Sequence, residues 1–157
     1  MGTSVWVVDD DDAVRGVLEA MLKELGYTVT CYDKAEDALN AYRVQAPDVV
    51  VTDVRMPGMS GLELTRTMLE INDRCIVMIL TGFPSIPDAV EAIRAGATDF
   101  LSKPVRMEEL RVRMERALET RVLHGRLSKA RILAWSLILS LPVWFILGIV
   151  LARMLQP

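Results

Sequence analysis

The chain has 157 residues, which is enough for one ordinary domain and a short appendage but not for two full domains. Its hydrophobic content of 52% excludes a disordered chain. Charge is unevenly distributed, because residues 1–104 carry 17 acidic and 9 basic side chains, whereas residues 105–157 carry 4 acidic and 9 basic ones. The acidic main body argues against nucleic-acid binding, so we expect no nucleic-acid partner.

Short β-rich runs alternate with helical stretches along the first 120 residues, a pattern typical of a parallel sheet with helices on both faces. The runs predict five strands, at Ser4 to Val8, Thr28 to Tyr32, Val49 to Thr52, Cys75 to Leu80 and Thr98 to Leu101. The spacing of apolar residues predicts helices at about 14–25, 35–45, 62–71, 87–95 and 107–120. In the first helix, one buried stripe is predicted from Val14, Val17, Leu18, Met21, Leu22 and Leu25.

Polar side chains stand at or just past the ends of four predicted strands. They are Asp9 and Asp10 after the first strand, Asp53 after the third, Thr81 after the fourth and Lys103 after the fifth. Because parallel strands end at one edge of the sheet, we expect these side chains to converge there. Three carboxylates within about 4 Å of one another repel by several kcal/mol, so protons or a divalent cation must compensate. All-oxygen ligands favour Mg²⁺.

Asp53 has a specific role available at such a site. A carboxylate can act as a nucleophile and take up a phosphoryl group as an acyl phosphate. Lys103 would supply a positive charge and Thr81 a hydroxyl donor to the phosphoryl oxygens, which is the positioning that phosphoryl transfer requires.

Each of these residues also has a purely structural interpretation. The acidic run 9–12 could favour a helix N-terminus, and Asp53 could form the turn that contains Pro57. Lys103 could belong to an ordinary loop and Thr81 to a strand exit. Their joint placement at four strand ends favours the functional interpretation.

Four segments resemble successive signature motifs of the response regulator receiver domain. They are VVDDDD from Val7, VVVTDVRMPGMSGLEL from Val49, ILTGFPS from Ile79 and ATDFLSKPV from Ala97. The resemblance covers about residues 1–120. It implies an α/β, flavodoxin-like fold whose five-stranded parallel sheet has the order 2-1-3-4-5 and carries helices on both faces.

The resemblance also implies a role for each matching carboxylate. Asp53 is the phosphoacceptor, and Asp10 and Asp53 are side-chain ligands of Mg²⁺. Asp9 acts nearby, partly through water, and the backbone carbonyl of Arg55 is a further metal ligand. The phosphoryl donor is a histidine kinase, a phosphotransfer protein or a small acyl phosphate.

Three other positions match the switch machinery of the family. Thr81 is the switch hydroxyl, Phe100 the switch aromatic residue and Lys103 the phosphate-binding lysine. The bond from Lys103 to Pro104 matches one that is cis in the family. The resemblance thus implies a switch with intrinsic autophosphorylation and autodephosphorylation rather than a turnover enzyme.

The end of the chain departs from the family pattern. Residues 132–152 contain no charged side chain, and at 1.5 Å per residue this run would cover about 31 Å, the thickness of a hydrocarbon core. Arg126, Lys129 and Arg131 precede the run and only Arg153 follows it, which places the preceding body in the cytoplasm. We therefore predict a receiver domain at 1–120, a basic juxtamembrane connector at 121–131 and a single transmembrane helix at 132–155. A buried core helix is the alternative interpretation of the apolar run.

Two functions remain open from the sequence. The chain is either a membrane-anchored single-domain response regulator or a membrane scaffold whose receiver domain docks other proteins, with phosphorylation secondary. Small residues at Ser136, Ser140, Gly148 and Ala152 are compatible with close packing against a partner helix or a second copy of the chain, but simple exposure of this face to lipid is the favoured interpretation. The basic connector could contact membrane lipid. The family suggests the bacterial inner (plasma) membrane.

Overall fold

The computed structural model of the chain describes residues 2–82 and 86–120. The elements in chain order are β1 (Ser4–Val8), α1 (Asp12–Glu24), β2 (Thr28–Tyr32), α2 (Ala35–Tyr42), β3 (Val49–Asp53), α3 (Gly61–Ile71), β4 (Ile76–Thr81), α4 (Ile86–Arg94) and β5 (Asp99–Ser102). A further helix covers residues 107–120. All five predicted strands are therefore present, with ends that differ by no more than one residue.

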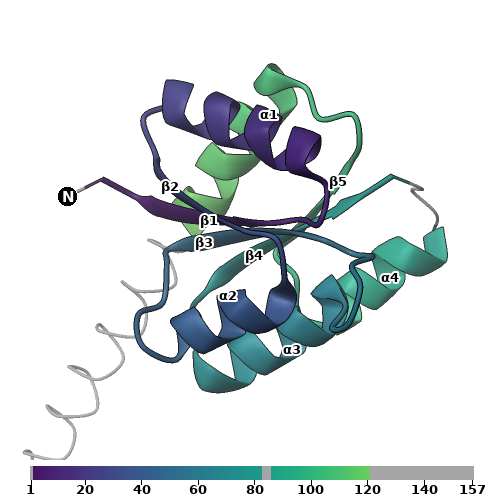
Figure 1. The fold of residues 1–157 in the computed structure, drawn as a ribbon. Helices are drawn as coiled ribbons and strands as arrows, with labels where there is room; N and C mark the ends of the chain where they lie inside the picture. Colours follow the sequence, from purple (N-terminus) through teal and green to yellow (C-terminus); the bar gives the residue numbers. More distant parts are fainter. Residues whose placement is uncertain (1, 83–85, 121–157) are drawn as a thin grey trace, which may run out of the picture. The chain divides into compact units, whose positions relative to one another are not determined.

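The five strands form one parallel sheet in the order β2-β1-β3-β4-β5. Helix α1 and the helix at 107–120 cover one face, and α2, α3 and α4 cover the other (Figure 1). This is the flavodoxin-like α/β arrangement that the sequence motifs predicted.

The core consists of two apolar layers, one on each face, because successive strand residues point to opposite sides of the sheet. The layer under α1 and the helix at 107–120 contains Val5, Val7, Leu18, Leu22, Val49, Val51, Ile76, Met78, Leu80, Leu101, Leu110, Met114 and Ala117. The layer under α2, α3 and α4 contains Trp6, Val8, Ala35, Ala38, Leu39, Tyr42, Val50, Met56, Leu62, Leu64, Met68, Cys75, Val77, Ile79, Ala92 and Ala95. Burial of both faces explains why the central strands β1, β3 and β4 are mostly apolar.

The end of α2 and the buried face of α1 differ from the prediction. Helix α2 ends at Tyr42 instead of continuing to residue 45, because the next residues form a turn in which the Val44 and Gln45 amides donate to the Ala41 carbonyl. The predicted buried stripe on α1 was wrong for Val17, whose exposed fraction is 53%. Val17 faces an open groove instead of the sheet.

No helix within the described residues is long and apolar enough to cross a membrane. The predicted connector at 121–131 and the predicted transmembrane helix at 132–155 lie outside the residues that the structure describes.

The pairing register of the strands determines which residues lie next to one another at the carboxyl edge of the sheet. Neighbouring pairs near that edge are Val8 with Thr52, Asp53 with Leu80, and Thr81 with Ser102. The ladder continues beyond β5, because the Lys103 amide donates to the Thr81 carbonyl at 2.7 Å. Asp9 therefore leaves its strand level with Asp53, and Lys103 lies one residue beyond Ser102, the register partner of Thr81.

Candidate functional site

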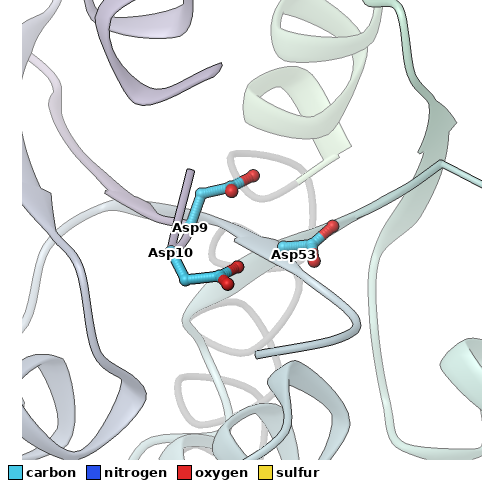
Figure 2. Close-up of side chains that lie close together, drawn as sticks. All are labelled: Asp9, Asp10 and Asp53. Atoms are coloured by element: carbon cyan, nitrogen blue, oxygen red, sulfur yellow. The ribbon is translucent and has the colours of Figure 1, made fainter. Parts of the chain in front are cut away.

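Three carboxylates meet at the carboxyl edge of the sheet. Asp9 and Asp10 directly follow β1 and Asp53 is the last residue of β3, as Figure 2 shows. One carboxylate oxygen from each lies within 4.8 Å of the others. Asp9 and Asp53 are buried, whereas Asp10 is exposed. The sequence prediction that these residues converge is confirmed.

The Lys103 ammonium joins two of these carboxylates. Its Nζ lies 2.6 Å from Oδ2 of Asp9 and 2.8 Å from Oδ1 of Asp53. Three carboxylates and one ammonium leave two net negative charges at the site, when all four groups are ionised. The peptide bond between Lys103 and Pro104 is cis, as predicted.

Burial and pairing act on the ionisation of this cluster in opposite directions. Burial raises the pKa of Asp9, although the hydrogen bonds from Lys103 and from the Asp11 amide partly oppose this effect. Burial also disfavours the charged form of Lys103, but hydrogen bonds to Asp53 and Asp9 outweigh it and raise the pKa of the ammonium. Lys103 is therefore held in its charged form.

Both carboxylate oxygens of Asp53 have a donor. Lys103 contacts Oδ1, and the Arg55 amide donates to Oδ2 at 3.0 Å. The Asp9 segment is held in a similar way, since the Asp11 amide donates to Oδ1 of Asp9 and Nη1 of Arg15 donates to the Asp9 carbonyl at 2.6 Å. These contacts fix the direction of the carboxylates before any ligand binds.

The donor set fits Mg²⁺. Its members are all oxygen atoms, they lie close enough to share one ion, and their excess negative charge equals the charge of a divalent cation. Asp10 and Asp53 would bind such an ion through their side chains, with Asp9 nearby. The Arg55 amide donates to the Asp53 carboxylate, so the main chain of Arg55 lies beside Asp53.

The two predicted switch residues lie on β4 and β5, the strands that follow β3 in the sheet. Thr81 is the last residue of β4 and is buried, and Phe100 in β5 is half-buried against the layer under α2, α3 and α4. Phe100 pairs in register with Ile79, two residues before Thr81. Since strand side chains alternate, Thr81 and Phe100 point to the same face of the sheet.

Gly61 has a role in the site that the sequence prediction missed. A Cβ at this position would lie 1.8 Å from the Asp53 carbonyl oxygen, so only glycine lets α3 begin this close to β3. Ser60 and Glu63 form a capping box that starts the helix at Gly61. The sequence pattern Ser60-Gly-Leu-Glu63 was the available signal for this start, one residue before the predicted one.

The fold and the site agree with comparisons to known proteins. The response regulator receiver domain family matches residues 5–115. The response regulator protein TodT of Pseudomonas putida is 40% identical over 106 residues, which are 68% of this chain and 47% of TodT. The DNA-binding transcriptional regulator NtrC of Escherichia coli is 40% identical over 114 residues, which are 73% of this chain and 24% of NtrC.

A solved structure shows the same similarity. The crystal structure of a response regulator receiver domain protein from Clostridium thermocellum superposes with a TM-score of 0.72 at 28% identity, covering 77% of this chain and 98% of that one. The chain belongs to the response regulator receiver family of two-component systems, whose members carry a phosphoacceptor aspartate and bind Mg²⁺ at an acidic pocket. It spans about half the length of TodT and about a quarter of that of NtrC.

Replacing Gly61 with alanine should lower the free energy of unfolding by about 2–4 kcal/mol, because the new methyl group would overlap the Asp53 backbone. Gly16→Ala in α1 is the matched control, since a Cβ there meets nothing within 4 Å and should stabilise the helix by about 0.5–1 kcal/mol. Urea unfolding of both variants measures the difference. Equal stability of the two variants would contradict the close approach of α3 to Asp53.

Replacing Lys103 with methionine should tighten Mg²⁺ binding by about three- to tenfold, because the ammonium competes with a cation for the same carboxylates. Without Mg²⁺ the variant should lose about 1–3 kcal/mol of stability, since buried Asp9 loses its partner. Calorimetric titration and urea unfolding test both effects. Lys23→Met, which removes an exposed ammonium on α1, should change neither. Unaltered Mg²⁺ affinity in the Lys103 variant would show that the cation binds elsewhere.

Proposed function

We propose that the chain is a membrane-anchored response regulator in which Asp53 accepts a phosphoryl group. The observation that carries the proposal is the arrangement around Asp53: its carboxylate is held by Lys103 and the Arg55 amide, next to Asp9 and Asp10. A carboxylate fixed in this way is a nucleophile whose direction is already set.

In the proposed reaction an Asp53 carboxylate oxygen attacks the phosphorus of the donor. The bond between phosphorus and the donor atom breaks, and its electron pair stays on the donor. Mg²⁺, when bound, supplies positive charge to the phosphoryl oxygens. Lys103, whose ammonium lies 2.8 Å from Asp53, is close enough to contact one of these oxygens and stabilise their charge.

The phosphoryl group would act as a switch through the strands next to Asp53. Thr81 lies one residue beyond the strand partner of Asp53 and on the same sheet face as Phe100. A hydroxyl drawn towards the phosphoryl group would free space into which Phe100 could move. The chain would therefore be a phosphoacceptor switch with autophosphorylation and autodephosphorylation chemistry only, rather than a turnover enzyme.

An apolar groove supports a protein donor, namely a histidine kinase or a phosphotransfer protein. The groove has a volume of about 240 Å³ and lies between α1 and the segment after β5. Its lining consists of Ala13, Val14, Val17, Leu18, Lys103, Pro104 and Val105. Lys103 belongs both to this lining and to the carboxylate cluster, so a protein seated on the groove would reach Asp53.

Membrane attachment is supported by the sequence of the chain. The uncharged run at 132–152 is long enough to span a bilayer, and Arg126, Lys129 and Arg131 precede it. We infer a single-pass anchor in the bacterial inner membrane with the receiver domain in the cytoplasm. The connector would contact anionic lipid, and the anchor would leave room for a partner helix or a second copy of the chain.

Phosphorylation of Asp53 can be tested with the purified full chain, a small acyl phosphate and Mg²⁺. The expected product is an acid-stable, base-labile adduct with the mass of one phosphoryl group. Asp53→Asn should abolish it, because an amide oxygen is a poor nucleophile, while the same change at exposed Asp73 should leave it intact. Absence of the adduct with every donor would favour the scaffold function instead.

Membrane attachment can be tested by washing membrane fractions at alkaline pH. The full chain should stay in the pellet, and a chain that ends at Thr120 should be released. A full-length variant that carries Leu139→Arg and Leu141→Arg should also be released, because each charge near the centre of a span costs about 2.5–3.5 kcal/mol. Release of the unaltered full chain would refute the anchor.

A further inference from the structure

The loop between β3 and α3, residues 54–60, carries the main chain that lies next to the carboxylate cluster. It is fixed near its start, where the Arg55 amide donates to Asp53. It is also fixed at its end, where the Ser60 amide donates to Oε2 of Glu63 at 2.9 Å. The acceptors of these two hydrogen bonds, Asp53 and Glu63, belong to β3 and α3, which are the elements that the loop connects.

A third contact comes from a different element. Oε1 of Glu36, in the first turn of α2, accepts a hydrogen bond from the Met59 amide at 2.8 Å. The same oxygen lies over Gly58, where a Cβ would be only 2.5 Å away, and Gly58 has a φ of 79°. The loop and the carboxylate are thus in direct contact at two successive residues.

The charge of Glu36 suits this contact. Hydrogen bonds from its own amide and from the Met59 amide lower the pKa of the carboxyl group. A carboxylate is a stronger acceptor for a backbone amide than a neutral oxygen.

Helix α2, which carries Glu36, is packed against the core. One face of the helix, formed by Ala35, Ala38, Leu39 and Tyr42, is buried in the core. Met56 of the loop is buried in the same apolar layer. The loop therefore shares an apolar layer with α2 through Met56 and contacts α2 directly through the Glu36 carboxylate.

We propose that Glu36 is a positioning residue for the metal site: by holding the turn at Gly58 and Met59, it keeps the Arg55 main chain next to the carboxylate cluster. The inference rests on the proposed function in that it assigns Mg²⁺ to this cluster. Glu36 touches neither the cluster nor a phosphoryl group, so its effect passes through the loop. Removing it should weaken Mg²⁺ binding without removing a ligand.

The test compares variants of the full chain, purified in mild detergent, by calorimetric titration with Mg²⁺. Glu36→Ala should raise the dissociation constant by about three- to tenfold, below the effect of removing a direct partner of a metal ligand. Glu36→Gln, which keeps an acceptor oxygen, should stay close to the unaltered chain. Asp37→Ala is the matched control, because it removes one exposed negative charge from the same helix turn.

A second measurement needs no metal. Amide hydrogen exchange at Met59 and its neighbours should be about tenfold faster or more in Glu36→Ala, at a thermal midpoint close to that of the unaltered chain. Gly58→Ala should weaken Mg²⁺ binding in the same direction, since its methyl group would displace the carboxylate.

Two results would overturn the inference. One is an unchanged Mg²⁺ dissociation constant in Glu36→Ala, and the other is an equal loss in Asp37→Ala, which would make the effect one of net charge. Neither result depends on phosphorylation, so a failure of Asp53 to accept a phosphoryl group would be recognised separately.

Discussion

The contact between one ammonium and two buried carboxylates is the interaction on which the site depends. Asp9 and Asp53 leave neighbouring strands at the same level, so their side chains come together. Two buried carboxylates whose oxygen atoms lie within 4.8 Å of each other destabilise the folded state unless a positive charge lies between them. Lys103, which follows Asp9 by 94 residues along the chain, provides that charge. The site is therefore complete only when β1, β3 and the segment after β5 all lie in place.

The packing of the central strands fixes their pairing register, on which the contact between Lys103 and the two carboxylates depends. The central strands β1, β3 and β4 are buried on both faces, so a shift by one residue would move each apolar side chain to the opposite layer. The two apolar layers thus stabilise the register on which the site depends. Around the strands, short connections supply the finer positions: the Arg55 and Asp11 amides orient the carboxylates, and Gly61 lets a helix begin against the backbone of Asp53.

Much of this structure could be predicted from the sequence, because the deciding information is local. The strands are short β-rich runs, and a polar residue stands at or just past the ends of β1, β3 and β5, so Asp9, Asp53 and Lys103 could be assigned to one edge from the sequence alone. Contacts that depend on distant segments could not be predicted in this way. Val17 has the spacing of a core residue, yet it borders a groove that the segment after β5 completes. Glu36 accepts a hydrogen bond from the Met59 amide, 23 residues further along the chain, and no local sequence pattern predicts that contact.

The closeness of Gly61 to the Asp53 backbone has a consequence for how the domain can vary in length. At the carboxyl edge, the connection from β3 to α3 is held by hydrogen bonds at Arg55, Met59 and Ser60, so an inserted residue would have to break a contact near Asp53. At the opposite edge, the turn between α2 and β3 exposes Val44 at 89% and takes part in none of these three hydrogen bonds. That turn is therefore the better place for an insertion or a fused module, because a longer chain there would leave the hydrogen bonds at Arg55, Met59 and Ser60 in place.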